Sequence, residues 1–566
     1  MDSSDPDGLA QSQSANAPGH HNAAGLNGSV ANASQSSEKK VVEKQPPGKL
    51  LPHMDHVIQR LNINLNGDSG TDANGVNGAN DVDNDASSKK KRKGKKPALK
   101  IYKGNFIHST WKKPVAILRN KIIGVDQGKI VFIEDAALLD EILAQYKATA
   151  WKKNIVLDVS EPLFFIPGFV DCHAHTYSYC TRGIQGGNNW RFQEGDKSYQ
   201  QINDDRFTKQ VIKDVLRQSL QNGTTSAAWH GTSVESVAII LSNFIDSSRQ
   251  RSQIGIDFNC DQVKEDVQML HVTKATDVTT TIAKMHKKGS RVTASVISSL
   301  PLVEWLETKM ATVRNHLDVP LKANSCKHDG SSRLSELEKL GILDEKTLLT
   351  NCCGLAPKDI KLIAEKESSI VHCPSSDYSS PNHRCVIPAI LKKKIKVGLG
   401  SDMLHSGSLS MAVAVRNCVE KSQSHFNCTK HVQDLENRIK HLENHTKYLD
   451  KTLRRIYSEE EEEENNEEES LNEEYVEPLH EEVVPYEEAF RMATLGGASV
   501  LGIEEHTGNF EVGKDFDALL IHPSVEDSAF SVYKPYDNMK DILQKFLFTG
   551  DDRNILQVYI AGERVK

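Results

Sequence analysis

Apolar, strand-like runs alternate with amphipathic helical stretches from about residue 163 onward. Between residues 334 and 340 leucines recur three apart with charges between them, and Gly341 supplies a helix-stop signal. Pro357 suits the first turn of another helix. The β-rich runs are residues 164–171, 224–230, 253–260, 291–299, 321–326, 348–353, 369–373 and 396–402. Eight strands alternating with helices predict an α/β fold, a (β/α)8 TIM barrel with its functional side chains at the carboxyl ends of the strands.

Strand-like patterns also flank this region, at residues 98–163 and 508–566. Neither segment is long enough for an independent domain, so we expect them to pair into a small β-sandwich domain built from both ends of the core. The barrel itself is predicted over residues 164–421, and residues 483–507 are predicted to hold its last helical region.

Two segments lack the composition of a packed core. Residues 1–97 are rich in Ser, Asn, Gly and Asp, which predicts a disordered tail. Residues 422–482 form a separate insert, and fourteen Glu between positions 459 and 482 account for the formal net charge of −8, which would otherwise be +6. Whole-chain charge therefore says nothing about the folded core.

The insert begins with a narrow apolar stripe over residues 432–456. Its members alternate three and four apart: Val432, Leu435, Ile439, Leu442, Thr446, Leu449, Leu453 and Ile456. This is the a/d pattern of a coiled coil, which needs a second copy or another protein as partner; the alternative is a single helix packed on the barrel. The acidic run that follows is a solvated linker or a patch for basic partners.

A basic run at residues 89–96 ends the predicted tail, with seven cations in the ten residues from Ser88 to Pro97. Such a run suits a nuclear import receptor and favours the nucleus over the cytosol; loose nucleic-acid contact and a solubilising linker are the weaker interpretations. The sequence has no stretch of about 18 apolar residues, so we expect no membrane span. Its N-terminus has neither the charged region nor the apolar region of a secretory signal. The ten cysteines follow no disulfide framework.

The strongest chemical signal is PGFVDCHAH at residues 167–175. His173 and His175 lie two apart on a strand, so both imidazoles can reach one metal ion. With GLGSD at residues 398–402, this layout resembles the amidohydrolase superfamily, and guanine deaminases in particular. Further stretches that carry the resemblance are KGNFIHSTW (103–111), NGTTSA (222–227), HCPSS (372–376), EAFRMATLGGA (488–498), GNFEVGKDFDALLI (508–521) and GDDRN (550–554).

The resemblance implies a zinc ion held by His173, His175, a fifth-strand histidine and Asp402. In this family the metal-bound hydroxide attacks the amino-bearing carbon of guanine, and a glutamate three residues past the fifth-strand histidine moves the proton. A sixth-strand histidine assists, while an arginine-phenylalanine pair and a glutamine hold the base. The products are xanthine and ammonia, and family members form homodimers.

This sequence departs from that pattern at most of the remaining positions. The fifth-strand ligand falls on Asn324, the proton shuttle on Lys327 and the sixth-strand histidine on Asn351. The positions that hold the base fall on Ser178, Ser299 and Leu300. An amide oxygen is a poor zinc ligand, and a protonated amine cannot accept a proton from water. No residue is therefore assigned a catalytic role.

Three states of the metal site remain open. His173, His175 and Asp402 could hold a weakened zinc, the site could bind no metal tightly, or Cys326, His328 and Cys353 could rebuild it with thiolates. His372 is interpreted as structural first.

The preferred function is a non-catalytic nuclear binding or scaffold protein related to guanine deaminase. The alternatives are an active zinc-dependent purine deaminase with altered ligands and a purine-binding sensor.

Overall fold

The computed structural model describes most of the chain from residue 99 onward. The described residues are 99–145, 155–159, 161–176, 179–180, 204–230, 235–258, 265–286, 290–298, 304–326, 331–377, 387–403, 407–457 and 483–566. All belong to one structural unit, Val57–Lys566. The predicted disordered tail, the basic run and the acidic run lie outside the described residues.

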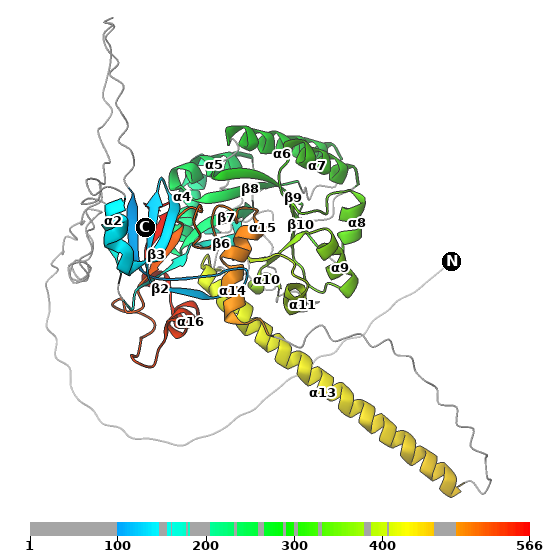
Figure 1. Cartoon of the computed structure of the whole chain (residues 1–566). Helices are drawn as coiled ribbons and strands as arrows, with labels where there is room; N and C mark the ends of the chain where they lie inside the picture. Colours follow the sequence, from blue (N-terminus) through cyan, green and yellow to red (C-terminus); the bar gives the residue numbers. More distant parts are fainter. Residues whose placement is uncertain are drawn as a thin grey trace, which may run out of the picture. The chain divides into compact units, whose positions relative to one another are not determined.

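Eight parallel strands form the central sheet, paired in the order in which they follow one another along the chain (Figure 1). They are β6 (Phe169–His175), β7 (Thr224–His230), β8 (Arg251–Asp257), β9 (Val292–Ser298), β10 (Leu321–Asn324), β11 (Thr347–Thr350), β12 (Ser369–His372) and β13 (Val397–Leu399). Beyond β13 the backbone N–H of Asp402 donates to the carbonyl of His173 on β6, at 2.9 Å. The sheet is therefore a nearly closed parallel barrel, as the alternation of strands and helices predicts.

Helices follow the strands and cover the outer face of the barrel (Figure 1). They are α4 (Asp205–Gln221), α5 (Glu235–Ser248), α6 (Glu265–Met285), α7 (Glu304–Leu317), α8 (Leu334–Lys339), α9 (Pro357–Glu365), α10 (Pro374–Asp377) and α11 (Ile387–Lys392). After the insert come α14 (Tyr486–Met492) and α15 (Leu495–Val500), and α15 packs on β6 and β13 where the barrel closes. The helix that packs where the barrel closes thus comes from a segment more than 300 residues after β6 in the sequence.

The two ends of the core form a second sheet of eight strands. They are β1 (Lys100–His108), β2 (Ala116–Asp126), β3 (Lys129–Asp135), β4 (Ile155–Asp158), β5 (Phe164–Pro167), β14 (Ala518–Ile521), β15 (Ile555–Ile560) and β16 (Glu563–Arg564). The helical elements of this part are η1 (Ala136–Leu138), α2 (Leu139–Gln145), α16 (Met539–Thr549) and η4 (Asp552–Asn554). Segments from both ends of the folded core contribute to this sheet.

The expected sandwich of two stacked sheets is replaced by one curled sheet. Its strands pair in a single path, β16-β15-β14-β5-β1-β2-β3, with β4 beside β1. Backbone hydrogen bonds then join residues 128–130 to residues 513–516. The curl encloses an aromatic core in which Tyr102 stacks on Phe516 at 4.2 Å and Phe106 on Phe165 at 5.0 Å between ring centroids. These large rings fill a rolled sheet without a second layer.

The boundary between the two parts falls inside the predicted first barrel strand. Residues 164–167 form β5, which pairs with β14 and β1 of the curled sheet, and the barrel strand β6 begins at Phe169. Gly168 separates them, and a Cβ there would lie 2.0 Å from the Thr225 hydroxyl oxygen. The chain thus changes sheets at a position where only glycine fits.

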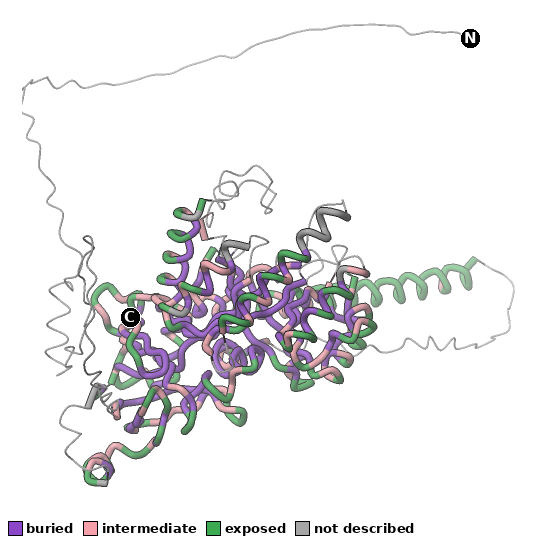
Figure 2. Tube along the Cα trace, turned by 90° about the horizontal axis from the view of Figure 1, so that it is seen from above, coloured by how far each residue is buried: buried purple, intermediate pink, exposed green. Residues whose placement is uncertain are grey.

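The insert begins as part of the barrel and continues as a long helix, α13 (Met411–Tyr457). Its first residues are buried, and Arg416 donates to the carbonyl of Leu547 at the end of α16, at 3.2 Å. From His431 onward nearly every residue is exposed (Figure 2), so this part is not packed on the barrel. No helix of the described residues combines the length and apolarity needed to cross a bilayer.

Candidate metal centre

Three potential ligands meet at the carboxyl ends of β6 and β13. The Nε2 atoms of His173 and His175 are 3.0 Å apart, and Nε2 of His175 lies 3.3 Å from Oδ1 of Asp402. The ligand atoms of all three residues lie within 4.8 Å of one another. The sequence prediction that these residues form one group is therefore matched by their positions in the barrel.

These separations suit a metal ion. A tetrahedral zinc with bonds of about 2.05 Å holds neighbouring ligand atoms about 3.3 Å apart. The closest pairs here are 3.0 and 3.3 Å apart, so the side chains would need to move by only a few tenths of an ångström. Two histidines and one carboxylate also form a recognised set for divalent metals with open coordination positions.

Asp171 fixes the backbone around this group. Its Oδ1 accepts the backbone N–H of His173 and the backbone N–H of Ser401, each at 3.0 Å. One carboxylate thus ties the strand that carries the paired histidines to the loop that carries Asp402. Burial raises the pKa of Asp171, and its hydrogen bonds to Ser401 and His173 oppose that shift. The two backbone N–H groups that donate to this carboxylate replace part of the solvation that water would otherwise give.

Electrostatics keep His173 in the form that binds metals. Burial lowers the pKa of His173 well below its ordinary value, and the neighbouring His175 and His230 lower it further. The imidazole is therefore neutral near pH 7 and has a lone pair to offer. Metal ligation by histidine requires this neutral form.

A third imidazole, from His230, belongs to the same cluster and was missed in the sequence. Its ring centroid lies 4.9 Å from those of His173 and His175, because the end of β7 pairs with the end of β6. Burial lowers the pKa of His230 to about 4, and a hydrogen bond to Asp257 opposes that shift. Its place at the end of the second predicted strand was the available signal, since such residues face the barrel mouth.

A buried lysine below the cluster is the second residue that sequence reasoning missed. Lys322 on β10 is 2% exposed, and its ammonium donates to the carbonyl of Ala228 at 3.3 Å. Burial lowers the pKa of Lys322 to about 8, while Cys172, Cys373 and Asp171 raise it. The lysine is thus mostly a cation at neutral pH, and it disfavours charge on both His173 and His230.

The two asparagines at predicted ligand positions stand at the ends of adjacent strands. Oδ1 of Asn324, at the end of β10, accepts a hydrogen bond from the hydroxyl of Thr350 at 2.7 Å. Asn351 directly follows β11, has φ of 52° and is exposed. Both asparagines thus stand at the carboxyl-terminal edge of the barrel, the same edge that carries the paired histidines at the end of β6.

Several predicted site positions lie outside the described residues: Ser178, Ser299, Leu300, Lys327 and His328. The thiolate alternative gains no support from the described cysteines. Cys326 donates to the carbonyl of Cys353 at 3.3 Å, and burial raises the pKa of both thiols. Among the described residues, the group that could hold a metal ion consists of His173, His175 and Asp402 and includes neither cysteine.

His372 has a structural environment. It ends β12, is buried, and its Nδ1 lies 2.7 Å from Oδ2 of Asp377. The same carboxylate oxygen accepts the backbone N–H of Cys373 at 2.9 Å. His372 therefore helps to fix the turn that leaves β12, as its interpretation as a structural residue requires.

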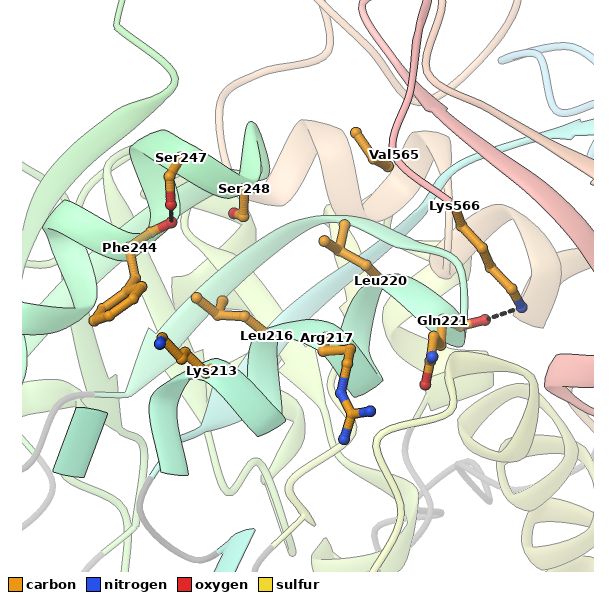
Figure 3. A pocket seen from close by; sticks show the side chains of 10 residues that line it. All are labelled: Lys213, Leu216, Arg217, Leu220, Gln221, Phe244, Ser247, Ser248, Val565 and Lys566. Atoms are coloured by element: carbon orange, nitrogen blue, oxygen red, sulfur yellow. Dashed lines mark hydrogen bonds between the residues drawn. The ribbon is translucent and has the colours of Figure 1, made fainter. Parts of the chain in front are cut away.

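A separate cavity of about 480 Å³ lies between α4, α5 and the end of the chain (Figure 3). Leu216, Leu220 and Phe244 line it together with Lys213 and Lys566. None of its lining residues belongs to the histidine cluster. This cavity is therefore distinct from the candidate metal centre.

The sequence pattern of the amidohydrolase family matches residues 164–434 and 469–565 of this chain. The chain belongs to that family. Among individual proteins, guanine deaminase of Rattus norvegicus is 29% identical over 494 residues, which cover 82% of this chain and 96% of that protein. Guanine deaminase of Homo sapiens is 28% identical over 498 residues, covering 83% and 97%. The protein is thus a guanine-deaminase-like amidohydrolase.

Solved structures share the same fold. Guanine deaminase from C. acetobutylicum with bound guanine in the active site gives a TM-score of 0.61 at 21% identity, covering 83% of this chain and all of that one. An adenosine deaminase from Xanthomonas campestris with bound zinc gives 0.57 at 15% identity, covering 82% and 92%. At these identities the likeness establishes the barrel and its companion sheet.

Proposed function

We propose that this amidohydrolase is a metal-binding relative of guanine deaminase that does not deaminate purines at an enzyme-like rate. The observation that carries the proposal is Asn324 at the end of the fifth barrel strand, where the family resemblance places an imidazole ligand. Its amide oxygen is engaged by Thr350 at 2.7 Å, and the cation of Lys322 lies buried two residues before it. The environment that would activate water is therefore weakened.

His173, His175 and Asp402 would hold the metal. Zinc, when bound, supplies a positive charge that lowers the pKa of a water molecule. Deamination also needs a base that takes a proton from that water, and the family position for this base is Lys327. General acid-base groups contribute about 10²- to 10⁴-fold each. Replacing the base and two imidazoles should therefore leave little turnover.

The test combines zinc content with guanine turnover. Purified protein is expected to contain up to one zinc per chain, and both His173→Ala and Asp402→Ala should lower that content. Incubation with guanine should yield no xanthine above the level of a reaction without protein. The zinc content of Lys396→Gln, in which an exposed lysine outside the site is changed, should equal that of the wild type. Steady formation of xanthine by the zinc-loaded chain would refute the proposal.

An active purine deaminase with altered ligands is the second candidate, and His230 favours it. This imidazole is in the same cluster as the paired histidines and could take the role of a missing histidine. Under this candidate, xanthine forms and His230→Asn abolishes the activity together with tight zinc binding. Under the first candidate, His230→Asn changes no activity because none is present.

We further propose that the protein acts in the nucleus as a binding or scaffold protein. The basic run at 89–96 supports import, with seven cations between Ser88 and Pro97. A fluorescent fusion of the full chain should concentrate in the nucleus, and alanine at the seven cationic positions should disperse it into the cytosol. Equal distribution of both proteins would contradict this part of the proposal.

A further inference from the structure

The exposed part of α13 carries an apolar stripe that nothing in the described structure covers. The seven large apolar members of the stripe are 41–68% exposed: Val432, Leu435, Ile439, Leu442, Leu449, Leu453 and Ile456. Burial of such a side chain contributes roughly 1.5–3 kcal/mol relative to exposure. A helix that leaves this many of them in water gains most by pairing with another helix.

The register of the stripe indicates the kind of pairing. Position a of the heptad holds Val432, Ile439, Thr446 and Leu453, and position d holds Leu435, Leu442, Leu449 and Ile456. Three of the four a residues are β-branched, and three of the four d residues are leucine. In coiled coils this distribution favours two parallel strands over trimers or tetramers.

The charges beside the stripe distinguish parallel from antiparallel pairing. The g positions hold His431, Arg438 and His445, and the e positions hold Glu436, Glu443 and Asp450. In a parallel dimer each g residue faces the e residue of the following heptad in the second helix, so Arg438 faces Glu443. Antiparallel pairing would place g against g and e against e, bringing like charges together. Charge complementarity therefore selects a second copy of this helix in parallel orientation.

We propose that this protein forms a parallel, in-register homodimer through residues 432–456 of α13. The occupant of the stripe is the same segment of a second copy. The stripe extends over about three and a half heptads from Val432 to the end of the described helix, and a/d patterns of this length are typical of coiled coils. Outside the stripe, the large exposed hydrophobic side chains of this part are Tyr448 and Tyr457, so pairing of two helices covers most of its apolar surface.

Cys428 provides a direct reporter of this arrangement. It is exposed and lies one heptad before Leu435, at the preceding d position. In a parallel, in-register dimer the two Cys428 thiols face each other across the helix pair. In an antiparallel dimer, or with a shift of a heptad or more, they are far apart.

The first experiment treats the reduced full-length protein with a short homobifunctional maleimide and resolves the products under denaturing conditions. We expect a covalent dimer that is lost in Cys428→Ser. As a matched control, Asn437→Cys in the Cys428→Ser background places a thiol at an outward f position, and it should cross-link far less. A chain that remains monomeric in sedimentation at all concentrations overturns the proposal. So does a dimer without a Cys428-dependent product.

The second experiment tests the charge pairing. Arg438→Glu and Glu443→Arg each place like charges across both g–e pairs of the dimer. Each should raise the concentration needed for half-maximal cross-linking roughly tenfold. The double variant restores opposite charges and should return to the wild-type value. Lys440→Glu makes the same charge change at an outward b position and should have no effect; equal weakening by Lys440→Glu and Arg438→Glu would overturn the proposal.

Discussion

At the scale of single residues, Lys322 is the feature that most changes the chemistry of the barrel. Its ammonium lies inside the barrel. A dication bound at the paired histidines would be repelled by this charge. A buried charge acts over a longer range than one in water, because the surroundings screen it poorly. Metal affinity and the charge of this one side chain are therefore coupled.

Lys322→Gln removes the cation and keeps a donor for the carbonyl of Ala228. We expect zinc affinity to rise roughly tenfold, since a unit charge near a dication at an effective dielectric constant of about 20 is worth more than 1 kcal/mol. Competition with a chromophoric chelator measures the affinity. Lys396→Gln is the control, and unchanged or weaker binding in Lys322→Gln would contradict the coupling.

His108 in the curled sheet gives a prediction about pH. Burial lowers its pKa to about 4; Glu511 opposes that shift and Lys514 reinforces it. The unfolded chain takes up a proton near pH 6.5, so stability present above about pH 6.5 is lost as pH falls toward 4. Between about pH 7.5 and pH 5 this residue should cost about 2 kcal/mol of unfolding free energy.

His108→Asn tests this prediction, because an amide oxygen can still accept the backbone N–H of Phe510, which Nδ1 of His108 accepts at 3.2 Å. Urea titrations at both pH values should show that the variant loses about 2 kcal/mol less stability than the wild type on acidification. An equal loss in the two proteins would show that His108 does not contribute.

Sequence reasoning found the site residues that lie in one local pattern. His173 and His175 share a strand, and Asp402 follows a recognisable strand end. Sequence reasoning did not identify His230 and Lys322, because their roles depend on neighbours on other strands. Alternation also places Lys322 on the same face as Asn324, but a lone lysine in a strand ordinarily reaches solvent.

At the scale of elements, Gly400 determines how tightly the barrel closes. A Cβ at this position would lie 2.6 Å from Cβ of His173 and 2.8 Å from the sulfur of Cys373. Glycine thus lets the end of β13 approach the strand that carries the paired histidines. The position of Asp402, two residues later, depends on that approach.

Gly400→Ala should therefore separate β13 from β6. We expect a loss of about 1–3 kcal/mol in stability, as for other overpacked sites, and weaker zinc binding because Asp402 moves away from His175. Thermal unfolding and zinc titration of the same preparations measure the two effects. A variant with unchanged melting temperature and zinc affinity would mean that the contact between the end of β13 and β6 tolerates a side chain at position 400.

Strand positions were more predictable than strand partners. Apolar runs bounded by turn residues mark the eight barrel strands, because each strand is defined locally. The curled sheet was expected as a sandwich, because the pairing of residues 128–130 with residues 513–516 joins segments almost 400 positions apart. No local pattern encodes a contact of that separation.

At the scale of the whole molecule, Arg251 joins the two sheets. It begins β8 at the amino end of the barrel, and its Nε donates to Oδ2 of Asp517 at 2.9 Å, while Asp515 takes a second bond. Asp517 has no exposed side-chain surface and also accepts the backbone N–H of Ala561 at 2.6 Å. One guanidinium thus connects a barrel strand to the turn that precedes β14.

Arg251→Met should leave the Asp517 carboxylate buried without its charged partner. Breaking such a pair costs about 3–5 kcal/mol, and we expect the curled sheet to unfold before the barrel. Urea unfolding followed by tryptophan fluorescence and circular dichroism would reveal two transitions. Arg217→Met, which removes an exposed pair with Asp214, should cost less than about 1 kcal/mol.

The helix α13 contains neither glycine nor proline from Met411 to Tyr457. At 1.5 Å per residue its length is about 70 Å, without a built-in hinge. Its first turns pack against α14 and α16, whereas its last turns are exposed to solvent. It can therefore serve as a rigid spacer that keeps whatever docks at its tip several nanometres from the barrel mouth.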